Sequence, residues 1–183
     1  MENIRTSYSQ KLLKYFLIVV LGSMLLTLSA KIKIPFYPVP MTMQTFVVLF
    51  LGISLGYKMA VSTVFVYLLE GLLGIPVFSN SPEKGVGLVY FTGPTMGYLI
   101  GFLFAAFISG YLNFQTNFVL IFFKLILSVF FIYLFGVIWL GYLIGWEKPI
   151  FQLGVAPFIY AELVKVLLLT FLATNIIKIR KII

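Results

Sequence analysis

Residues 118–145, FVLIFFKLILSVFFIYLFGVIWLGYLIG, decide the fold class, because this run of 28 residues is apolar apart from one charged residue, Lys124. About 20 apolar residues in a helix already cross the hydrocarbon core of a bilayer, which is about 30 Å thick. The run therefore predicts a transmembrane helix that tilts, kinks or extends beyond the membrane.

The composition of the whole chain agrees with lipid as its main solvent. Of 183 residues, 62% are hydrophobic and only 10% are charged, with a mean hydropathy of +1.12. Soluble domains carry about 25% charged residues. The chain contains no Cys and no His, which excludes thiolate and imidazole metal ligands and the commonest general base. It also has no phosphate-binding loop or hydrolase motif. We therefore predict no enzyme, metal site or cofactor.

Apolar runs separated by Gly, Pro and charged residues predict an all-α bundle of six transmembrane helices in one domain, residues 1–183. The predicted spans are 11–30, 42–55, 59–74, 95–111, 118–145 and 157–177. The first run, preceded by Lys11 and Lys14, would also fit a signal peptide. We favour a span of the bundle, because the rest of the chain is itself membrane-embedded.

The net charge of +8 follows the membrane topology and does not indicate nucleic acid as a partner. Lys and Arg near the span ends favour both termini in the cytoplasm, with seven residues inside against four outside. The inner set is Arg5, Lys11, Lys14, Lys58, Lys178, Arg180 and Lys181, and the outer set is Lys31, Lys33, Lys84 and Lys148. The long connections 31–41, 75–94 and 146–156 then face outward.

Two opposite charges interrupt the last predicted span, APFIYAELVKVLLLTFLATNII (156–177). Glu162 and Lys165 are three residues apart and share a helix face, which a membrane directs toward the bundle interior. They form either a structural ion pair or a ligand site under the outward loops, and we favour the ligand site. Lys124 is expected to extend to the cytoplasmic surface, whereas the role of Glu70 stays open.

Other candidate ligand contacts lie near the same end of the predicted bundle. They comprise the amides Gln44 and Asn80 and the aromatic residues Phe46, Phe78 and Tyr90. Together with Glu162 and Lys165, they suit a small molecule with an apolar body, neutral N–H and C=O groups and a negative end.

Small residues recur every four positions in the fourth span, at Gly97, Gly101, Ala105 and Ser109. Such stripes let helices approach closely in lipid. Packing within the bundle is the favoured interpretation, and docking onto a separate membrane subunit is the alternative.

Four runs of the sequence together resemble the BioY family, the biotin-capturing membrane subunits (S components) of energy-coupling factor (ECF) transporters. They are AKIKIPFYPVPMTMQTFVVLFLG (30–52), YLLEGLLGIPVFSN (67–80), GPTMGYLIGF (93–102) and PFIYAELVKV (157–166). The resemblance implies a six-helix S-component fold that binds biotin at the outer side of a bacterial plasma (inner) membrane. It also implies, as partners, one transmembrane coupling subunit and two cytoplasmic ABC ATPases.

The resemblance also assigns residue roles. The family pattern P-F-x-P-G-D-x-x-K places Glu162 and Lys165 on its Asp and Lys, with Tyr160 and Ala161 in place of Pro and Gly, and Asn80 matches the family's asparagine. The ureido N–H groups are expected to donate to Glu162, and the ureido oxygen to accept from Asn80 or Gln44. The rings are expected to lie on Phe46, Phe78 and Tyr90, and Lys165 to neutralise the valerate. The coupling subunit is expected to contact the first span at Gly22, Ser23, Thr27 and Ala30.

An alternative is a self-sufficient or ion-coupled carrier for biotin or another small carboxylated vitamin. It would use Glu162, Lys165, Lys124 and Glu70 as a proton or cation relay.

Overall fold

The computed structural model describes residues 2–180, with side chains from residue 9 onward. Lys181 and the side chain of Arg5, both used above for orientation, lie outside the described part. The longer helices are α1 (Glu2–Lys31), α2 (Gln44–Leu55), α3 (Tyr57–Leu72), α5 (Met96–Tyr111), α6 (Phe118–Ile144) and α8 (Ile159–Ile179). The short elements are α4 (Leu88–Phe91), α7 (Ile150–Gly154), the 3₁₀ turn η1 (Ala156–Phe158) and the strands β1 (Lys33–Ile34) and β2 (Met41–Thr42).

Within residues 2–180, three helical segments are long and apolar enough to cross a membrane: Ser9–Lys31, Phe118–Ile144 and Ile150–Ile179. Helices α2 and α5 are apolar but shorter. Large apolar side chains such as Leu21, Phe123 and Phe171 are exposed on α1, α6 and α8. These outward-facing side chains fit a protein whose sides contact lipid.

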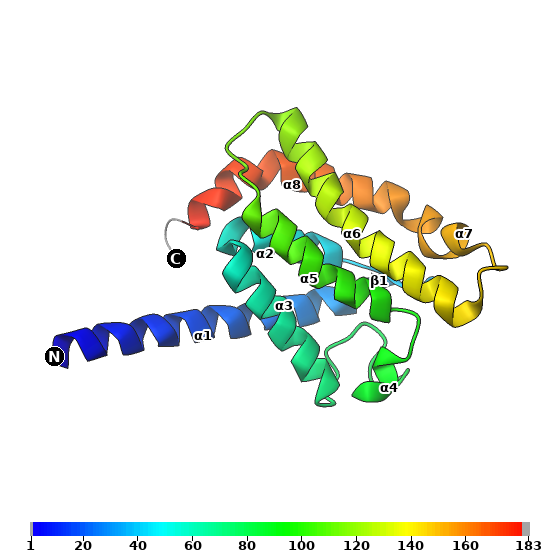
Figure 1. Ribbon diagram of the computed structural model, residues 1–183, viewed down its shortest axis with the longest axis horizontal. Helices are drawn as coiled ribbons and strands as arrows, with labels where there is room; N and C mark the ends of the chain where they lie inside the picture. The colour runs from blue at the N-terminus through cyan, green and yellow to red at the C-terminus, as the bar shows by residue number, and fades with distance from the viewer. Residues whose placement is uncertain (1, 181–183) are drawn as a thin grey trace.

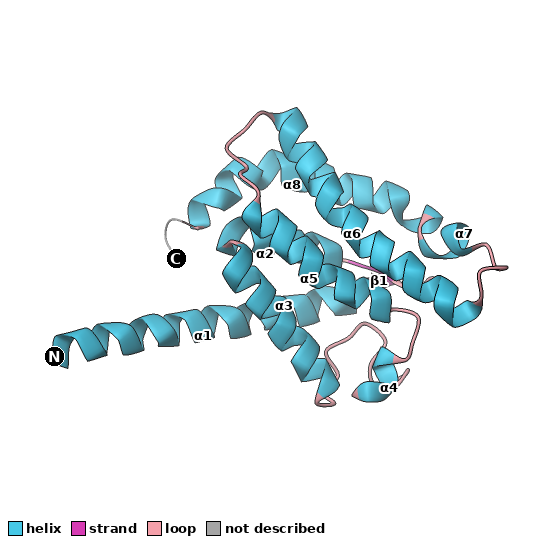
Figure 2. Ribbon diagram, in the orientation of Figure 1, coloured by secondary structure: helices cyan, strands magenta, loops and turns pink. Residues whose placement is uncertain are grey.

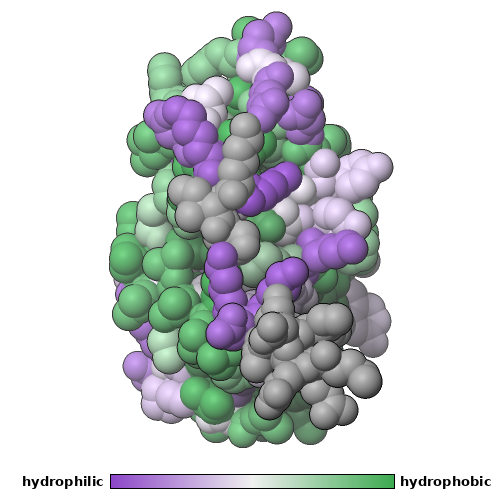
Figure 3. Space-filling view, turned by 90° about the vertical axis from the view of Figure 1, so that its left-hand side faces the viewer, coloured by the Kyte–Doolittle hydropathy of each residue, from purple (hydrophilic) through white to green (hydrophobic). Residues whose placement is uncertain are grey.

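The connections between helices gather at two ends of the bundle (Figure 1). On the right lie residues 32–43, 73–95 and 145–158, which we call the loop end. On the left lie the chain termini, the α2–α3 turn and residues 112–117, which we call the turn end. Figure 2 shows that loops and the small hairpin are concentrated at the loop end. Figure 3 looks onto the turn end, where hydrophilic side chains run from the top of the view down its middle and hydrophobic ones cover much of the left side.

The bundle centres on α5, which packs against α2, α3 and α6. Its small residues permit this close approach. A Cβ on Gly101 would lie 2.6 Å from the Cα of Ile132 in α6, and a Cβ on Gly52 in α2 would lie 2.8 Å from the Cβ of Ser109. Packing within the bundle, predicted from the small-residue stripe, is thus confirmed.

Helix boundaries differ from the predicted spans at the loop end. Helix α2 begins at Gln44, two residues later than predicted, because Met41 and Thr42 form β2 and pair with β1. This two-stranded hairpin lies in the first long connection, which was predicted as residues 31–41. Gly56, with φ of +79°, ends α2 and lets α3 start at Tyr57.

Candidate functional site

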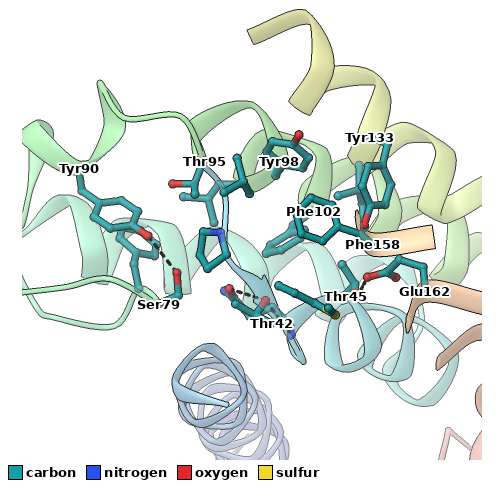
Figure 4. A pocket seen from close by; sticks show the side chains of 17 residues that line it. Thr42, Thr45, Ser79, Tyr90, Thr95, Tyr98, Phe102, Tyr133, Phe158 and Glu162 are labelled. Atoms are coloured by element: carbon teal, nitrogen blue, oxygen red, sulfur yellow. Dashed lines mark hydrogen bonds between the residues drawn. The ribbon is translucent and has the colours of Figure 1, made fainter. Parts of the chain in front are cut away.

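A cavity lies at the loop end (Figure 4), with about 530 Å³ of empty space that includes its opening to solvent. Residues from α2, α5, α6 and α8 and from all three segments of the loop end line it. They are Val39, Pro40, Met41, Thr42, Gln44, Thr45, Phe78, Ser79, Tyr90, Thr95, Tyr98, Leu99, Phe102, Ile132, Tyr133, Phe158 and Glu162.

One wall of the cavity is built around Phe78, which is almost fully buried. Its ring stacks on Tyr90 with centroids 4.6 Å apart and meets the edge of Tyr67 at 5.3 Å. The ring fits only because residue 71 is glycine, since a Cβ there would overlap its atoms. The hydroxyl of Tyr90 is 3.3 Å from Ser79 Oγ, as Figure 4 shows. The wall is therefore a fixed aromatic surface.

The opposite wall comes from α5, α6 and the start of α8. The hydroxyl of Tyr98 donates to the carbonyl of Gly154 at 2.8 Å, which ties α5 to α7. Phe158 meets the edge of Phe36 at 5.9 Å and lies 6.2 Å from the ring of Tyr133. The space between the two walls is thus mostly apolar and aromatic.

Glu162 and Lys165 form an ion pair, with Lys165 Nζ 2.8 Å from Glu162 Oε1, and each residue is only 7% exposed. Thr45 Oγ1 donates to the same carboxylate oxygen at 2.9 Å and lies 3.0 Å from Lys165 Nζ. Lys165 also donates to the carbonyl of Thr42 at 2.6 Å. Three groups therefore hold the side chain of Lys165.

The second carboxylate oxygen of Glu162 is the main unfilled acceptor of the site. Oε2 is buried and has no hydrogen-bond partner among the described residues. Glu162 lines the cavity, where the side chain of Tyr133 lies close enough to interact with its carboxylate (Figure 4). A buried charged oxygen without a well-formed hydrogen bond is costly, so this atom is suited to a donor supplied by a ligand.

The structure brings Glu162, Gln44, Phe78 and Tyr90 together around the cavity. The other predicted ligand contacts lie outside it. Asn80 lines a smaller neighbouring cavity at the mouth, together with Lys84. Lys165 lines an apolar groove on the other side of the ion pair. Phe46 packs against the hydrophobic core.

Sequence reasoning missed several residues that line the cavity, including Tyr98, Phe102, Tyr133 and Thr45. The three aromatic residues lie in predicted spans. Because the chain has 20 Phe and 11 Tyr, being aromatic did not distinguish these residues from the rest. Thr45 follows Gln44 directly in the entry to the second span. A polar residue so close to a predicted contact was the available clue.

The remaining embedded charges lie away from the cavity. Ser23 Oγ donates to both oxygens of Glu70, at 2.7 and 2.6 Å, which joins α1 to α3. Lys124 Nζ donates to the carbonyl of Asn113 at the turn end, 2.6 Å away.

The predicted docking residues of α1 are mostly covered within this chain. Gly22, Ser23 and Ala30 are buried, and Thr27 is half-buried. A Cβ on Gly22 would lie 2.6 Å from the side chain of Thr63, so this face of α1 packs on α3.

A helical bundle with apolar sides, holding an aromatic cavity and a buried carboxylate at one end, is a membrane protein built to bind a small molecule. The chain belongs to the BioY family, whose model matches residues 3–182.

Two relatives whose names include BioY match this chain over most of their length. The protein named "Probable biotin transporter BioY" from Pyrococcus horikoshii is 36% identical over 148 residues, covering 81% of this chain and 86% of the relative. "Biotin transporter BioY" from Thermotoga maritima is 34% identical over 155 residues, covering 84% and 90%.

A solved structure has the same fold. It is described as the S-component for biotin from an ECF-type ABC transporter, and its TM-score with this chain is 0.75. The match covers 94% of this chain and 93% of that one at 24% sequence identity. The predicted S-component fold is confirmed by this likeness.

Proposed function

We propose that this chain captures biotin as the substrate-binding S component of an ECF-type ABC importer. Membership of the BioY family and the names of its relatives support the ligand. The observation that carries the proposal is the unpartnered Oε2 of Glu162 at the edge of an aromatic cavity. Biotin offers the matching groups: ureido N–H donors, an apolar bicycle and a carboxylate tail.

The polar groups of the cavity suggest how the ureido ring is held. A ureido N–H donates to Glu162 Oε2, and the negative charge on that acceptor strengthens the bond. Gln44 Nε2 gives one N–H to Tyr67 Oη at 2.7 Å, so its second N–H is available for the ureido oxygen. The bicycle then lies against Phe78 and Tyr90. Phe46 packs against the hydrophobic core and does not line the cavity, so we assign it no ligand contact.

The carboxylate tail has two candidate partners. The sequence favours Lys165, whose ammonium is already held by Glu162, Thr45 and Thr42. The geometry favours the mouth cavity, which contains Lys84 and shares Tyr90 and Thr95 with the main cavity. We place the carboxylate at Lys84 and assign Lys165 to holding Glu162 charged and oriented.

A comparison of ligands separates the two assignments. Lys84→Met should weaken biotin more than biotinamide, which lacks the carboxylate, whereas Lys165→Met should weaken both equally. If Lys165→Met affects biotin selectively, the sequence-based assignment is correct and ours is wrong. Calorimetry on the purified protein gives the four affinity ratios.

The same measurement tests the function itself. The purified chain should bind biotin and neither thiamine nor riboflavin. Glu162→Gln removes the negative charge but keeps the shape, and it should weaken biotin by about 10- to 100-fold, the value of a hydrogen bond to a charged group. Circular dichroism controls for folding. No binding of biotin, or binding indifferent to Glu162→Gln, contradicts the proposal.

As partners we infer a transmembrane coupling subunit and two cytoplasmic ABC ATPases, in a bacterial plasma membrane with both termini in the cytoplasm. The chain has no ATP-binding loop of its own, which favours a partner as the source of energy. Because Thr27 is the half-buried member of the predicted docking set, Thr27→Trp tests that face. It should lower copurification of the coupling subunit and leave biotin affinity unchanged.

The carrier alternative finds no continuous relay in the described contacts. Glu70 bonds to Ser23, and Lys124 bonds to Asn113 at the far end, so neither is linked to Glu162. Reconstitution of the chain alone in vesicles decides between the two. Biotin uptake that follows a proton gradient without ATPases supports the carrier.

A further inference from the structure

One wall of the cavity is a piece of irregular backbone. Residues 76–81 connect α3 to the rest of the second outward connection, and Phe78 and Ser79 from this segment line the cavity. Four of its residues, Val77, Phe78, Ser79 and Ser81, are buried. Buried carbonyl groups outside regular structure need donors, because no helix or sheet ladder supplies them.

Two lysines, Lys31 at the end of α1 and Lys33 at the start of β1, donate to four of the carbonyls of this segment. Lys31 Nζ donates to the carbonyls of Pro76 at 2.9 Å, Phe78 at 2.8 Å and Ser81 at 2.9 Å. An ammonium group has three N–H donors, so this one is fully used. Lys33 Nζ donates to the carbonyl of Ser79 at 2.6 Å and to Asn80 Oδ1 at 3.1 Å.

The other two carbonyls of the segment have donors from elsewhere. Val77 accepts from the hydroxyl of Tyr67 in α3 at 3.2 Å, and Asn80 accepts from the backbone N–H of Lys84 at 2.7 Å. Lys31 is therefore the group that holds both ends of the segment, at Pro76 and Ser81.

The end of α1 is also joined to another part of the cavity. Two residues after Lys31, β1 begins and pairs with β2, whose residues Met41 and Thr42 line the cavity. A displacement of the end of α1 would thus act on two cavity-lining segments at once. No other helix end in the described structure donates three hydrogen bonds from one side chain to this connection.

We infer that Lys31, assisted by Lys33, is a positioning residue that sets the cavity wall carrying Phe78 and Ser79, and thereby sets how long the ligand is retained. Lys31 touches the wall and not the cavity, so it acts through the backbone of residues 76–81. The identity of the ligand as biotin rests on the proposed function, whereas the attachment of the wall does not.

The test combines hydrogen exchange with ligand dissociation. In Lys31→Met, exchange of the amides of residues 77–81 in the ligand-free protein should rise about tenfold or more, while α2, α5 and α6 keep their protection. Biotin should dissociate about tenfold faster, with little change in its association rate. Lys33→Met should show the same pattern at smaller size. Lys148→Met, an exposed lysine at the same end, is the matched control and should change neither quantity.

Unchanged exchange at residues 77–81, or a rise spread evenly over the bundle, would overturn the inference, because the first shows no attachment and the second shows general destabilisation. If exchange of residues 77–81 rises but the dissociation rate of biotin stays the same, the claim about ligand retention is overturned. If the wild-type protein does not bind biotin, the proposed function fails, while the exchange of residues 77–81 still decides whether Lys31 holds the wall.

Discussion

The turn end and the loop end of the bundle belong to the same helices but differ in how the helices are connected and packed. At the turn end, Gly56 alone separates α2 from α3, and Gly52 lies directly against Ser109. Arg180 Nη2 donates to the carbonyl of Gly52 at 2.9 Å. At the loop end a cavity lies between the helices and their connections, and side chains such as Lys31 satisfy irregular backbone. Changes in helix contact at the turn end should therefore alter stability alone, whereas changes at the loop end can alter binding as well.

The largest effect should come from breaking the ion pair at the loop end. Lys165→Met leaves the buried carboxylate of Glu162 without its cation, and loss of one partner from a buried pair costs about 3–5 kcal/mol. Adding Glu162→Gln to the same chain should restore a large part of this loss. Denaturant unfolding of the ligand-free protein measures both. Equal destabilisation of the single and double variants would show that the pair does not determine stability here.

A smaller effect is expected at the turn end. Gly52→Val places a branched side chain against Ser109, and overpacking of this kind costs about 1–3 kcal/mol of stability. Biotin affinity of the folded fraction should stay the same, because the contact is remote from the cavity. The check pairs unfolding curves with calorimetry. A change in affinity without a change in stability would contradict the separation of the two ends.

For a glycine at the loop end, we predict a loss of biotin affinity. Gly71→Ala directs a methyl group onto the ring of Phe78, which must move within the cavity wall. Biotin should bind about tenfold more weakly, equivalent to about 1.4 kcal/mol. Titration calorimetry on this variant measures the difference. A wild-type affinity would mean that Phe78 does not contact the ligand.

The smallest effect should come from the link between α1 and α3. Ser23→Ala removes the two hydrogen bonds to Glu70, but this carboxylate is only half-buried. A loss of about 1 kcal/mol or less is therefore expected, with biotin affinity unchanged. The control variant is Thr27→Ala, which deletes a hydroxyl that is hydrogen-bonded within α1 itself. The difference between the two variants in thermal unfolding gives the contribution of the bonds between α1 and α3. A larger loss would identify Glu70 as a structural anchor.

Much of the helical framework follows from the lengths of apolar runs. The run 118–145 appears as α6 over Phe118–Ile144, because a long apolar segment in lipid has little choice but a helix. The position of Glu162 in the site was also predictable, since an embedded charge must face inward. The direction of Lys165 was not, because helical spacing fixes where the Cα lies and leaves a long side chain free to reach Thr42.

Two further features lay beyond sequence reasoning. Tyr98 and Tyr133 line the cavity, yet they look like any other aromatic residues of a membrane helix. Lys31 counted only as one of the charges that set topology, although its hydrogen bonds run to carbonyls 45 to 50 positions away. Contacts over such separations depend on how the bundle packs, and local patterns do not report them.

The hydrogen bond from the indole of Trp139 to the carbonyl of Gly93, 2.9 Å long, supplies the protein with its own optical probe. Gly93 lies between Tyr90 and Thr95, which both line the cavity. The only other tryptophan of the chain is Trp146, which is 63% exposed. Replacing Trp146 by Phe would leave Trp139 as the single tryptophan, half-buried, and its emission would sense the segment between α4 and α5. Filling of the cavity could then be followed in real time without an attached dye.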